Sequence, residues 1–216
     1  MSFELYGFWR SLATFRVRIA MNLKGLDYRE HSIDLMAGEQ HAAKFRSINP
    51  MAAVPALVED GHLPITQSLA ILEYLEEVYP TPALLPAEPR ARAHVRELAL
   101  TVAADGHPLV VPRVRNYLTD VLKLDEPTKL IWIEHWSRAA LGALEVRLAP
   151  VSGPYCFGQT PTLADICLVT HVVGARLFKF DVSDFPACVR IVDRCLALEA
   201  FARAHPLKQP GAPAAH

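Results

Sequence analysis

The chain has 216 residues, of which 51% are hydrophobic and 21% charged, a composition typical of a folded globular protein and not of a disordered one. Its 22 basic and 23 acidic residues leave a net charge of −1, which argues against electrostatic binding of nucleic acid. No apolar run approaches the roughly 20 residues of a membrane helix, and the N-terminus lacks the pattern of a signal peptide, so we expect a cytoplasmic protein that binds no membrane.

The first 80 residues alternate strand and helix patterns. An aromatic strand over residues 3–8 is followed by a helix that starts after Ser11, repeats apolar residues every four positions and ends at Gly25. The next predicted elements are a strand (28–33), a weak helix (39–47), two short strands (56–58 and 63–65) and a helix that opens at Ser68 and ends before Pro80. This β-α-β-α-β-β-α order predicts a small mixed sheet covered by helices.

Four prolines fall within residues 80–89, where no helix can continue, and the strand patterns vanish after them. The later segments read as helices over 90–106, 128–148, 162–179 and 186–204, with Trp132, Trp136, Ala139 and Ala143 on one face of the second. We therefore predict an α/β domain over residues 1–80, a linker over 81–89, an all-helical domain over 90–205 and a flexible tail over 206–216.

Three places in the first domain could carry chemistry. Ser11 precedes the first turn of a helix, whose unpaired N–H groups attract an anion, although Ser11 could equally be a simple N-cap. The Val54-Pro55 bond is a candidate cis peptide that would leave the Val54 backbone free to bind an extended peptide, or else an edge-strand proline. Gln67 and Ser68 open a helix whose N-terminus could hold a carboxylate.

Two other features indicate structure rather than catalysis. Thr162 and Asp165 have the spacing of a capping box at the start of an apolar helix. The four cysteines form no Cys-x-x-Cys pair and have no histidine at the spacing of zinc ligands, so we expect reduced packing residues and no metal site.

Several segments together resemble the zeta-class glutathione transferases, a class that includes maleylacetoacetate isomerase and maleylpyruvate isomerase. The matching segments cover nearly the whole chain, and they are residues 8–20, 49–57, 67–71, 79–86 and 161–165. The resemblance implies a thioredoxin-like N-terminal domain, an all-helical C-terminal domain, a homodimer and glutathione as cofactor.

The resemblance also implies roles for single residues. Ser11 lies against the glutathione sulfur and, with Arg10, forms the catalytic pair. The Val54 backbone, beside a cis Pro55, pairs with the cysteinyl unit of glutathione. The remaining implied glutathione contacts are Gln67 and Ser68 at the γ-glutamyl carboxylate, and Gln40 and His107.

A hydroxyl at the start of a helix is sufficient to ionise a bound thiol. A free thiol has a pKa of ~8.5, a charge-assisted hydrogen bond contributes about 1.5–3 kcal/mol, and the helix N-terminus adds about 0.3–1 kcal/mol. At about 1.36 kcal/mol per unit, these contributions lower the pKa by roughly 1.3–3 units. In the isomerases that this chain resembles, the thiolate adds to the cis double bond of a maleyl substrate, the bond rotates, and elimination leaves the trans product.

The sequence departs from the family pattern in three places. Leu12 and Ala13 replace a serine and a cysteine after Ser11, and Val110 and Val111 replace two asparagines. Leu177 stands where the isomerases carry a substrate-binding arginine. Arg176 precedes it by one residue, which rotates its side chain by about 100° on a helix, so that it either reaches the substrate or is a surface charge.

These departures leave three functions open. The first is a glutathione-dependent isomerase of aromatic catabolism, with Arg10 as the main holder of substrate carboxylates and with Arg113, Arg115 and Arg176 as weaker candidates. The second is a glutathione transferase or peroxidase acting on apolar electrophiles, because the departures make the acceptor site less polar. The third is a catalytically silent binding module, against which the presence of Ser11 argues.

Overall fold

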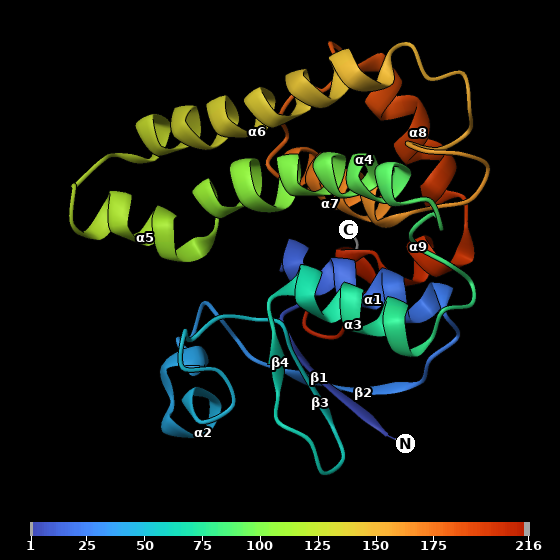
Figure 1. Cartoon of the computed structure of the whole chain (residues 1–216). Helices are drawn as coiled ribbons and strands as arrows, with labels where there is room; N and C mark the ends of the chain where they lie inside the picture. Colours follow the sequence, from blue (N-terminus) through green and yellow to red (C-terminus); the bar gives the residue numbers. More distant parts are fainter. Residues whose placement is uncertain (1, 214–216) are drawn as a thin grey trace. The chain divides into compact units, whose positions relative to one another are not determined.

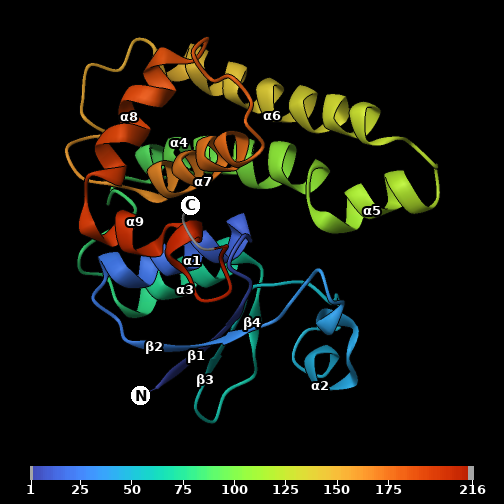
Figure 2. The same cartoon turned by 180° about the vertical axis from the view of Figure 1, so that it is seen from behind.

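The computed structural model describes residues 2–213, which form two compact units (Figures 1 and 2). The first unit consists of the chain up to Leu84 together with the segment from Ala197 onward, and the second spans Leu85–Leu196. The unit boundary therefore falls inside the proline-rich segment. Met1 and residues 214–216, which belong to the expected first domain and tail, lie outside the described residues.

The first unit is built on a four-stranded mixed sheet with the order β2-β1-β3-β4. Its strands are β1 (Phe3–Gly7), β2 (Tyr28–Ser32), β3 (Ala56–Glu59) and β4 (Ile65–Thr66). β1 pairs with β2 in parallel and with β3 in antiparallel orientation, and β3 pairs antiparallel with β4. The predicted mixed sheet of a thioredoxin-like domain is thus confirmed.

Helices α1 (Leu12–Leu23) and α3 (Ser68–Val78) cover one face of this sheet (Figure 1). Ser11 is the N-cap of α1, and Gly25, with φ 65°, follows its C-cap Lys24 in the left-handed region that glycine tolerates. The predicted weak helix is a 3-10 turn, η1 (Glu39–His41), followed by the short α2 (Ala43–Arg46). Strand and cap patterns therefore located these elements to within a few residues.

The second unit contains helices alone among its regular elements. They are α4 (Pro89–Leu100), the π-helix η2 (Thr101–Gly106), the 3-10 turn η3 (His107–Leu109), α5 (Pro112–Asp120), α6 (Glu126–Leu148), α7 (Leu163–Leu177) and α8 (Pro186–Leu196). Every residue of α7 from Leu163 to Ala175 is buried, so α7 is the central helix of this unit. The all-helical architecture predicted after the linker is confirmed.

The capping box and the cysteines behave as expected. Asp165 accepts hydrogen bonds from the backbone N–H and the hydroxyl of Thr162, both at 2.8 Å, and from the N–H of Cys156 at 2.8 Å. All four cysteines are free and buried. Burial raises the pKa of the Cys156, Cys188 and Cys195 thiols above the ordinary value, which suits packing residues better than nucleophiles.

The face of α6 that carries Trp132, Trp136, Ala139 and Ala143 is not the face that this helix buries. Trp132 and Trp136 are only half-buried, and Ala139 and Ala143 are exposed. The residues that α6 buries are instead Ile133, Ser137, Ala140, Leu141, Leu144 and Leu148. A shift of one residue turns a helical face by about 100°, so the tryptophans lie at the margin of the core.

The C-terminal end also differs from the expected organisation. The single helix expected over residues 186–204 is two helices, α8 and α9 (Glu199–Ala204), and the chain from Ala197 onward belongs to the first unit. There Phe201 is fully buried, and the Asn22 side chain of α1 donates to Ala200 O at 2.9 Å and accepts from Arg203 at 2.8 Å. Pro206–Lys208 form a further 3-10 turn in which Pro206 is buried, so the expected flexible tail over 206–216 begins with an ordered turn.

Candidate active site

The register of the sheet brings the three candidate places of the first unit to one end. Tyr6 near the end of β1 pairs with Ala56 at the start of β3, and Ala56 pairs with Thr66 at the end of β4. Each candidate place lies within a few residues of one of these pairs. The three places are the turn that carries Ser11, the Val54-Pro55 bond and the start of α3. Segments more than 50 residues apart in the sequence therefore meet at the same edge.

Ser11 caps α1 and keeps its hydroxyl hydrogen available. Its Oγ accepts a hydrogen bond from Thr14 N at 3.2 Å, and its own N–H donates to Phe8 O at 3.0 Å. Within residues 2–213 the Ser11 hydroxyl donates to no acceptor. The N-cap and the sulfur-binding interpretations are therefore compatible, because the oxygen accepts from the helix while the hydrogen remains free for a ligand.

Val54 lies just before β3, at a cis bond to the buried Pro55. Its N–H and C=O have no hydrogen-bond partner among the described residues, and the ladder with β4 begins only at Ala56. A free donor and a free acceptor on one residue can pair with an extended peptide as a neighbouring strand does.

The start of α3 combines backbone strain with positive charge. Gln67 is exposed and has φ 71°, a conformation that costs a residue other than glycine about 1–3 kcal/mol and that is frequent at functional sites. Ser68 is buried, and its Oγ accepts a hydrogen bond at 3.1 Å from the guanidinium of Arg16, which is 2% exposed. The helix N-terminus and Arg16 together favour a carboxylate at this place.

Gln40 supplies a further unpaired acceptor in η1. The residue is 9% exposed, and its Nε2 lies 3.5 Å from Leu35 O and 3.2 Å from His41 Nε2. Its Oε1 is buried and lacks a hydrogen-bond partner among residues 2–213. Buried acceptors are nearly always satisfied in folded proteins, so this oxygen is suited to a ligand N–H group.

Arg10 lies beside Ser11 in the same turn and is half-buried. Burial lowers the pKa of its guanidinium, which remains a cation at neutral pH. A partly desolvated cation binds a carboxylate more strongly than an exposed one, so Arg10 has the properties expected of a carboxylate holder.

The other sequence-predicted residues belong to the second unit. His107 is half-buried and opens η3, directly after the π-helix, and Arg113 is exposed on α5. Arg176 is exposed at the end of α7, where it donates to Asp193 of α8 at 3.0 Å. This ion pair favours the interpretation of Arg176 as a surface charge. The guanidinium of Arg115 lies 5.3 Å from the centre of the Phe178 ring.

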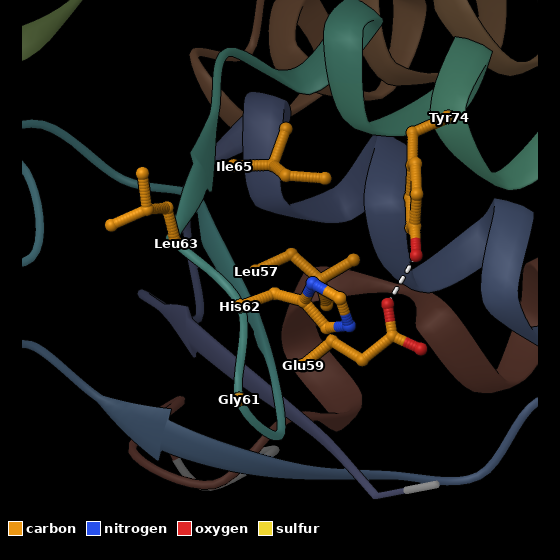
Figure 3. Close-up of a pocket in the computed structure, with 7 residues that line it drawn as sticks. All are labelled: Leu57, Glu59, Gly61, His62, Leu63, Ile65 and Tyr74. Atoms are coloured by element: carbon orange, nitrogen blue, oxygen red, sulfur yellow. Dashed lines mark hydrogen bonds between the residues drawn. The ribbon is translucent and has the colours of Figure 1, made fainter.

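A pocket of about 520 Å³ lies elsewhere in the first unit, between the β3–β4 hairpin and α3 (Figure 3). Figure 3 shows Tyr74 of α3 pointing to Glu59, to whose carboxylate its hydroxyl donates. This hydrogen bond is the largest of the effects that raise the pKa of Tyr74 to about 12. None of the sequence-predicted site residues lines this pocket, so it is not the candidate active site.

Within residues 2–213, neither a membrane-spanning helix nor a metal-binding group of side chains is found. None of their helices is both long and apolar enough to span a membrane. Their His, Cys, Asp and Glu side chains form no group of three or more that could hold a metal ion.

The chain is similar to known proteins over nearly its whole length. Residues 1–77 match the model of the glutathione S-transferase N-terminal domain. Over 214 residues the chain is 44% identical to a probable maleylacetoacetate isomerase of Vibrio cholerae, covering 98% of this chain and 99% of that protein. The chain belongs to the maleylacetoacetate isomerase family of the glutathione S-transferases.

Solved structures of the family have the same fold. A maleylacetoacetate isomerase of Methylobacterium extorquens AM1, with bound malonate and GSH, is 50% identical and superposes with a TM-score of 0.96, over 98% of this chain and all of that one. A maleyl pyruvate isomerase of the zeta class is 42% identical with a TM-score of 0.94, over 97% of this chain and all of that one. The glutathione transferase architecture predicted from the sequence is thus confirmed.

Arg16 and Arg18 are further functional candidates, which no sequence motif indicated. Both lie on α1, and both are buried, at 2% and 0% exposure. Their position between the apolar residues Phe15, Val17 and Ile19 indicates that they are buried. Because an arginine is rarely buried without a specific partner, this position could have marked them as candidates.

Proposed function

We propose that this protein is a glutathione-dependent cis–trans isomerase of maleyl dicarboxylates, either maleylacetoacetate or maleylpyruvate. The observation that carries this proposal is similarity over the full length to isomerases of both kinds, one of them solved with GSH and the dicarboxylate malonate. The product would be the corresponding trans, fumaryl compound.

The residues of the first unit fit glutathione as a cofactor. The tripeptide carries amide groups that suit the free N–H and C=O of Val54, an N–H that suits the unpaired Oε1 of Gln40, and a carboxylate that suits the start of α3. Gln67 and Ser68 would bind this γ-glutamyl carboxylate above the buried Arg16. His107 would be a further glutathione contact.

Bound glutathione would supply a thiolate that adds reversibly to the cis double bond, so that the resulting single bond can rotate before elimination. The part of Ser11 is to hold this sulfur ionised by donating its free hydroxyl hydrogen. The N-terminus of α1 stabilises the same negative charge. Together these two interactions contribute about 1.8–4 kcal/mol, which lowers a thiol pKa from ~8.5 into the neutral range.

A dicarboxylate substrate requires cations that orient it. Arg10 is the strongest candidate, because it is adjacent to Ser11 and partly desolvated. Arg113 and Arg176 are weaker ones, since Arg113 is exposed and Arg176 already pairs with Asp193. Loss of a carboxylate-holding arginine typically costs about 1.5–3 kcal/mol, so Arg10→Ala should raise the KM for substrate more than any other of these substitutions.

We further propose a cytoplasmic homodimer with a role in the breakdown of aromatic compounds. In this arrangement the first unit is the thioredoxin-like glutathione-binding domain and the second is the helical domain. Light scattering after gel filtration tests the oligomeric state, since a monomer of 23.9 kDa and its dimer differ twofold in mass.

The decisive experiment follows maleylpyruvate, or an analogue of maleylacetoacetate, by ultraviolet absorbance with and without glutathione. If the cis compound disappears only when glutathione is present, and glutathione is not consumed, the result would support the isomerase function. No isomerisation despite glutathione binding would refute it.

Substitutions at Ser11 test the mechanism separately from the fold. Ser11→Gly removes the hydroxyl, although glycine as an N-cap costs only a few tenths of a kcal/mol of stability. We expect turnover to fall by about tenfold or more, as a hydrogen bond of about 1.5–3 kcal/mol to the sulfur requires. As a matched control, Asp125→Ala removes the N-cap of α6, which accepts from Thr128 N at 3.0 Å, and should leave turnover unchanged. Unchanged turnover in Ser11→Gly would exclude the proposed role.

A second candidate function is a glutathione transferase or peroxidase for apolar electrophiles. It is favoured by Val110, which is apolar and 7% exposed where the family pattern has a polar amide, and by the ion pair that occupies Arg176. Consumption of glutathione with an apolar electrophile, together with no isomerisation of maleylpyruvate, would establish this function instead.

A further inference from the structure

A partly buried ion pair joins α1 to β2 directly behind the turn that carries Ser11. Arg18 of α1 has a side chain of 0% exposure, and Glu30 of β2 one of 21%. The Arg18 Nε donates to Glu30 Oε2 at 2.8 Å, and its Nη2 donates to Oε1. Both carboxylate oxygens are therefore held in a two-point contact, which fixes the orientation of the guanidinium.

The same guanidinium also donates hydrogen bonds to the backbone just before Ser11. Arg18 Nη1 donates to Trp9 O and Nη2 to Phe8 O, both at 3.3 Å. Phe8 O accepts in addition from the N–H of Ser11 at 3.0 Å. One carbonyl is thus shared between the arginine and the proposed catalytic residue, so a movement of Arg18 moves the backbone that places Ser11.

The Glu30 carboxylate has little room to move toward the Phe8–Ser11 turn. A Cβ atom added to Gly7, the last residue of β1, would lie 2.7 Å from Glu30 Oε1 and would overlap Thr14 Cγ2. The carboxylate therefore lies directly against the backbone where β1 ends. Gly7 O also accepts from Ile33 N at 2.7 Å, which ties the end of β2 to the same place.

Stability alone does not explain such a pair, because a buried ion pair can often be replaced by well-packed apolar residues without loss. Apolar residues, however, cannot bind two consecutive carbonyl oxygens. The hydrogen bonds from Arg18 to Phe8 O and Trp9 O are therefore the contribution that an apolar pair could not replace.

We propose that Arg18 and Glu30 are positioning residues that set the pKa of the glutathione thiol by fixing the place of the Ser11 hydroxyl. The proposal rests on the proposed function of Ser11. A hydrogen bond weakens steeply with distance and angle, so a small shift of the Phe8–Ser11 turn weakens the bond to the sulfur. Contacts of glutathione with Val54 and Ser68 come from other segments and should persist.

Two variants loosen the pair to different degrees. Glu30→Gln keeps the shape of the side chain but leaves one oxygen, so it cannot accept both bonds from Arg18. Arg18→Lys keeps the positive charge but has a single nitrogen, which cannot reach the carboxylate and both carbonyls together. If Arg18→Lys does not fold, Glu30→Gln still tests the proposal.

The measured quantity is the pKa of the enzyme-bound thiol, taken from the thiolate absorbance and from the pH dependence of kcat/KM. We expect both variants to raise it by about one unit or more, which lowers turnover below that pKa about tenfold. The Kd of glutathione at low pH, where the thiol is protonated, should change less than about threefold, because the backbone contacts remain.

A matched control is a second ion pair of this unit. Lys24 Nζ donates to Glu76 Oε2 at 2.8 Å and to Tyr79 O at 2.6 Å, none of which lies in the Ser11 turn. Glu76→Gln should lower the melting temperature as Glu30→Gln does, yet leave the pKa of the bound thiol unchanged. If Glu30→Gln lowers the melting temperature and also leaves this pKa unchanged, the pair is merely structural and the proposal is overturned.

A double variant separates this proposal from the role of Ser11. If Glu30 acts through the Ser11 hydroxyl, Ser11→Ala with Glu30→Gln shifts the thiol pKa no further than Ser11→Ala alone. Additive shifts would show that Glu30 acts on the sulfur by another route. If Ser11→Ala itself leaves the pKa unchanged, the proposed function of Ser11 fails, and the positioning role fails with it. A shift in Ser11→Ala without one in Glu30→Gln refutes the positioning role alone.

Discussion

Asp165 is the single acceptor for two buried backbone N–H groups, and its removal should destabilise the second unit severely. The residue is 0% exposed, while its donors Cys156 and Thr162 are 3% and 5% exposed. A buried donor left without an acceptor costs about 1–3 kcal/mol, so Asp165→Ala should cost about 2–6 kcal/mol. With a urea m-value of about 2 kcal/mol/M, this is a fall of about 1–3 M in the unfolding midpoint.

Two milder substitutions should cause smaller losses of stability than Asp165→Ala. Asp165→Asn keeps one oxygen, so only one backbone N–H loses its acceptor, and the expected cost is about 1–3 kcal/mol. Thr162→Val removes the hydroxyl of the capping box but leaves both backbone bonds to the Asp165 carboxylate, for a cost of about 0.5–1.5 kcal/mol. Urea titration followed by far-ultraviolet circular dichroism should therefore rank the losses as Asp165→Ala, then Asp165→Asn, then Thr162→Val. A smaller loss for Asp165→Ala than for Thr162→Val would refute the argument.

The pH dependence of the same variants has a definite sign. Burial raises the pKa of Asp165 above its ordinary value of 3.8, against the opposing effect of its hydrogen bonds. The folded state therefore binds the proton more tightly than the unfolded state, so this residue's contribution to stability falls as the pH rises from 3.8 through the raised pKa. The difference in free energy of unfolding between the parent protein and Asp165→Asn should accordingly decrease as the pH rises through that range. Urea titration at each pH measures this difference.

Two further predictions concern the first unit. Lys24→Met deprives the buried Glu76 carboxylate of its cation and should cost about 3–5 kcal/mol in urea unfolding. The additional change Glu76→Leu removes the unpaired charge but also the acceptor of the buried Leu84 N–H, so it should restore only part of the loss; a double variant as stable as the parent protein would contradict this. Tyr74, whose pKa is raised to about 12 chiefly by its hydrogen bond to Glu59, should ionise last in an ultraviolet titration of the folded protein, and Tyr74→Phe should abolish that step. Because the folded pKa lies above the ordinary 10.0, the stabilisation from this hydrogen bond is present below pH 10 and is lost as the pH rises from 10 through 12.

Local signals predicted the elements of the sheet domain well. Ser11 as N-cap, Gly25 with its positive φ and the prolines after Val78 act on the chain within one turn, so their effect is visible in the sequence. The short strands were recognisable for the same reason, since their aromatic and apolar residues and the turn residues that flank them are neighbours in the sequence.

Features that depend on distant contacts were not predictable in this way. α6 exposes Leu130, Ile131 and Val146, so its apolar residues lie all around the helix and do not single out the face that packs. The π-helix over Thr101–Gly106 has no sequence signal of its own. Its last residue lies so close to α6 that a Cβ atom on Gly106 would approach Ala140 Cβ to 2.7 Å, which is a tertiary constraint.

The candidate site shows the same division. Ser11, Val54 and Ser68 were identified from their positions next to predicted helix and strand ends and from the family resemblance. Arg16 and Arg18 were not, because their roles depend on Ser68 and Glu30, which lie 52 and 12 residues away in the sequence. A charged residue within an apolar helix becomes interpretable only when its partner is known.

The packing of α9 on α1 has a consequence for biosynthesis. Phe201 and Ala204 complete the hydrophobic core of the first unit, although they are synthesised after the whole of the second unit. Domains generally fold as units while the chain emerges from the ribosome, with the N-terminal one first. Here the nascent sheet domain would present an uncovered apolar face of α1 throughout the synthesis of residues 85–196, so its final closure is delayed until translation is almost complete.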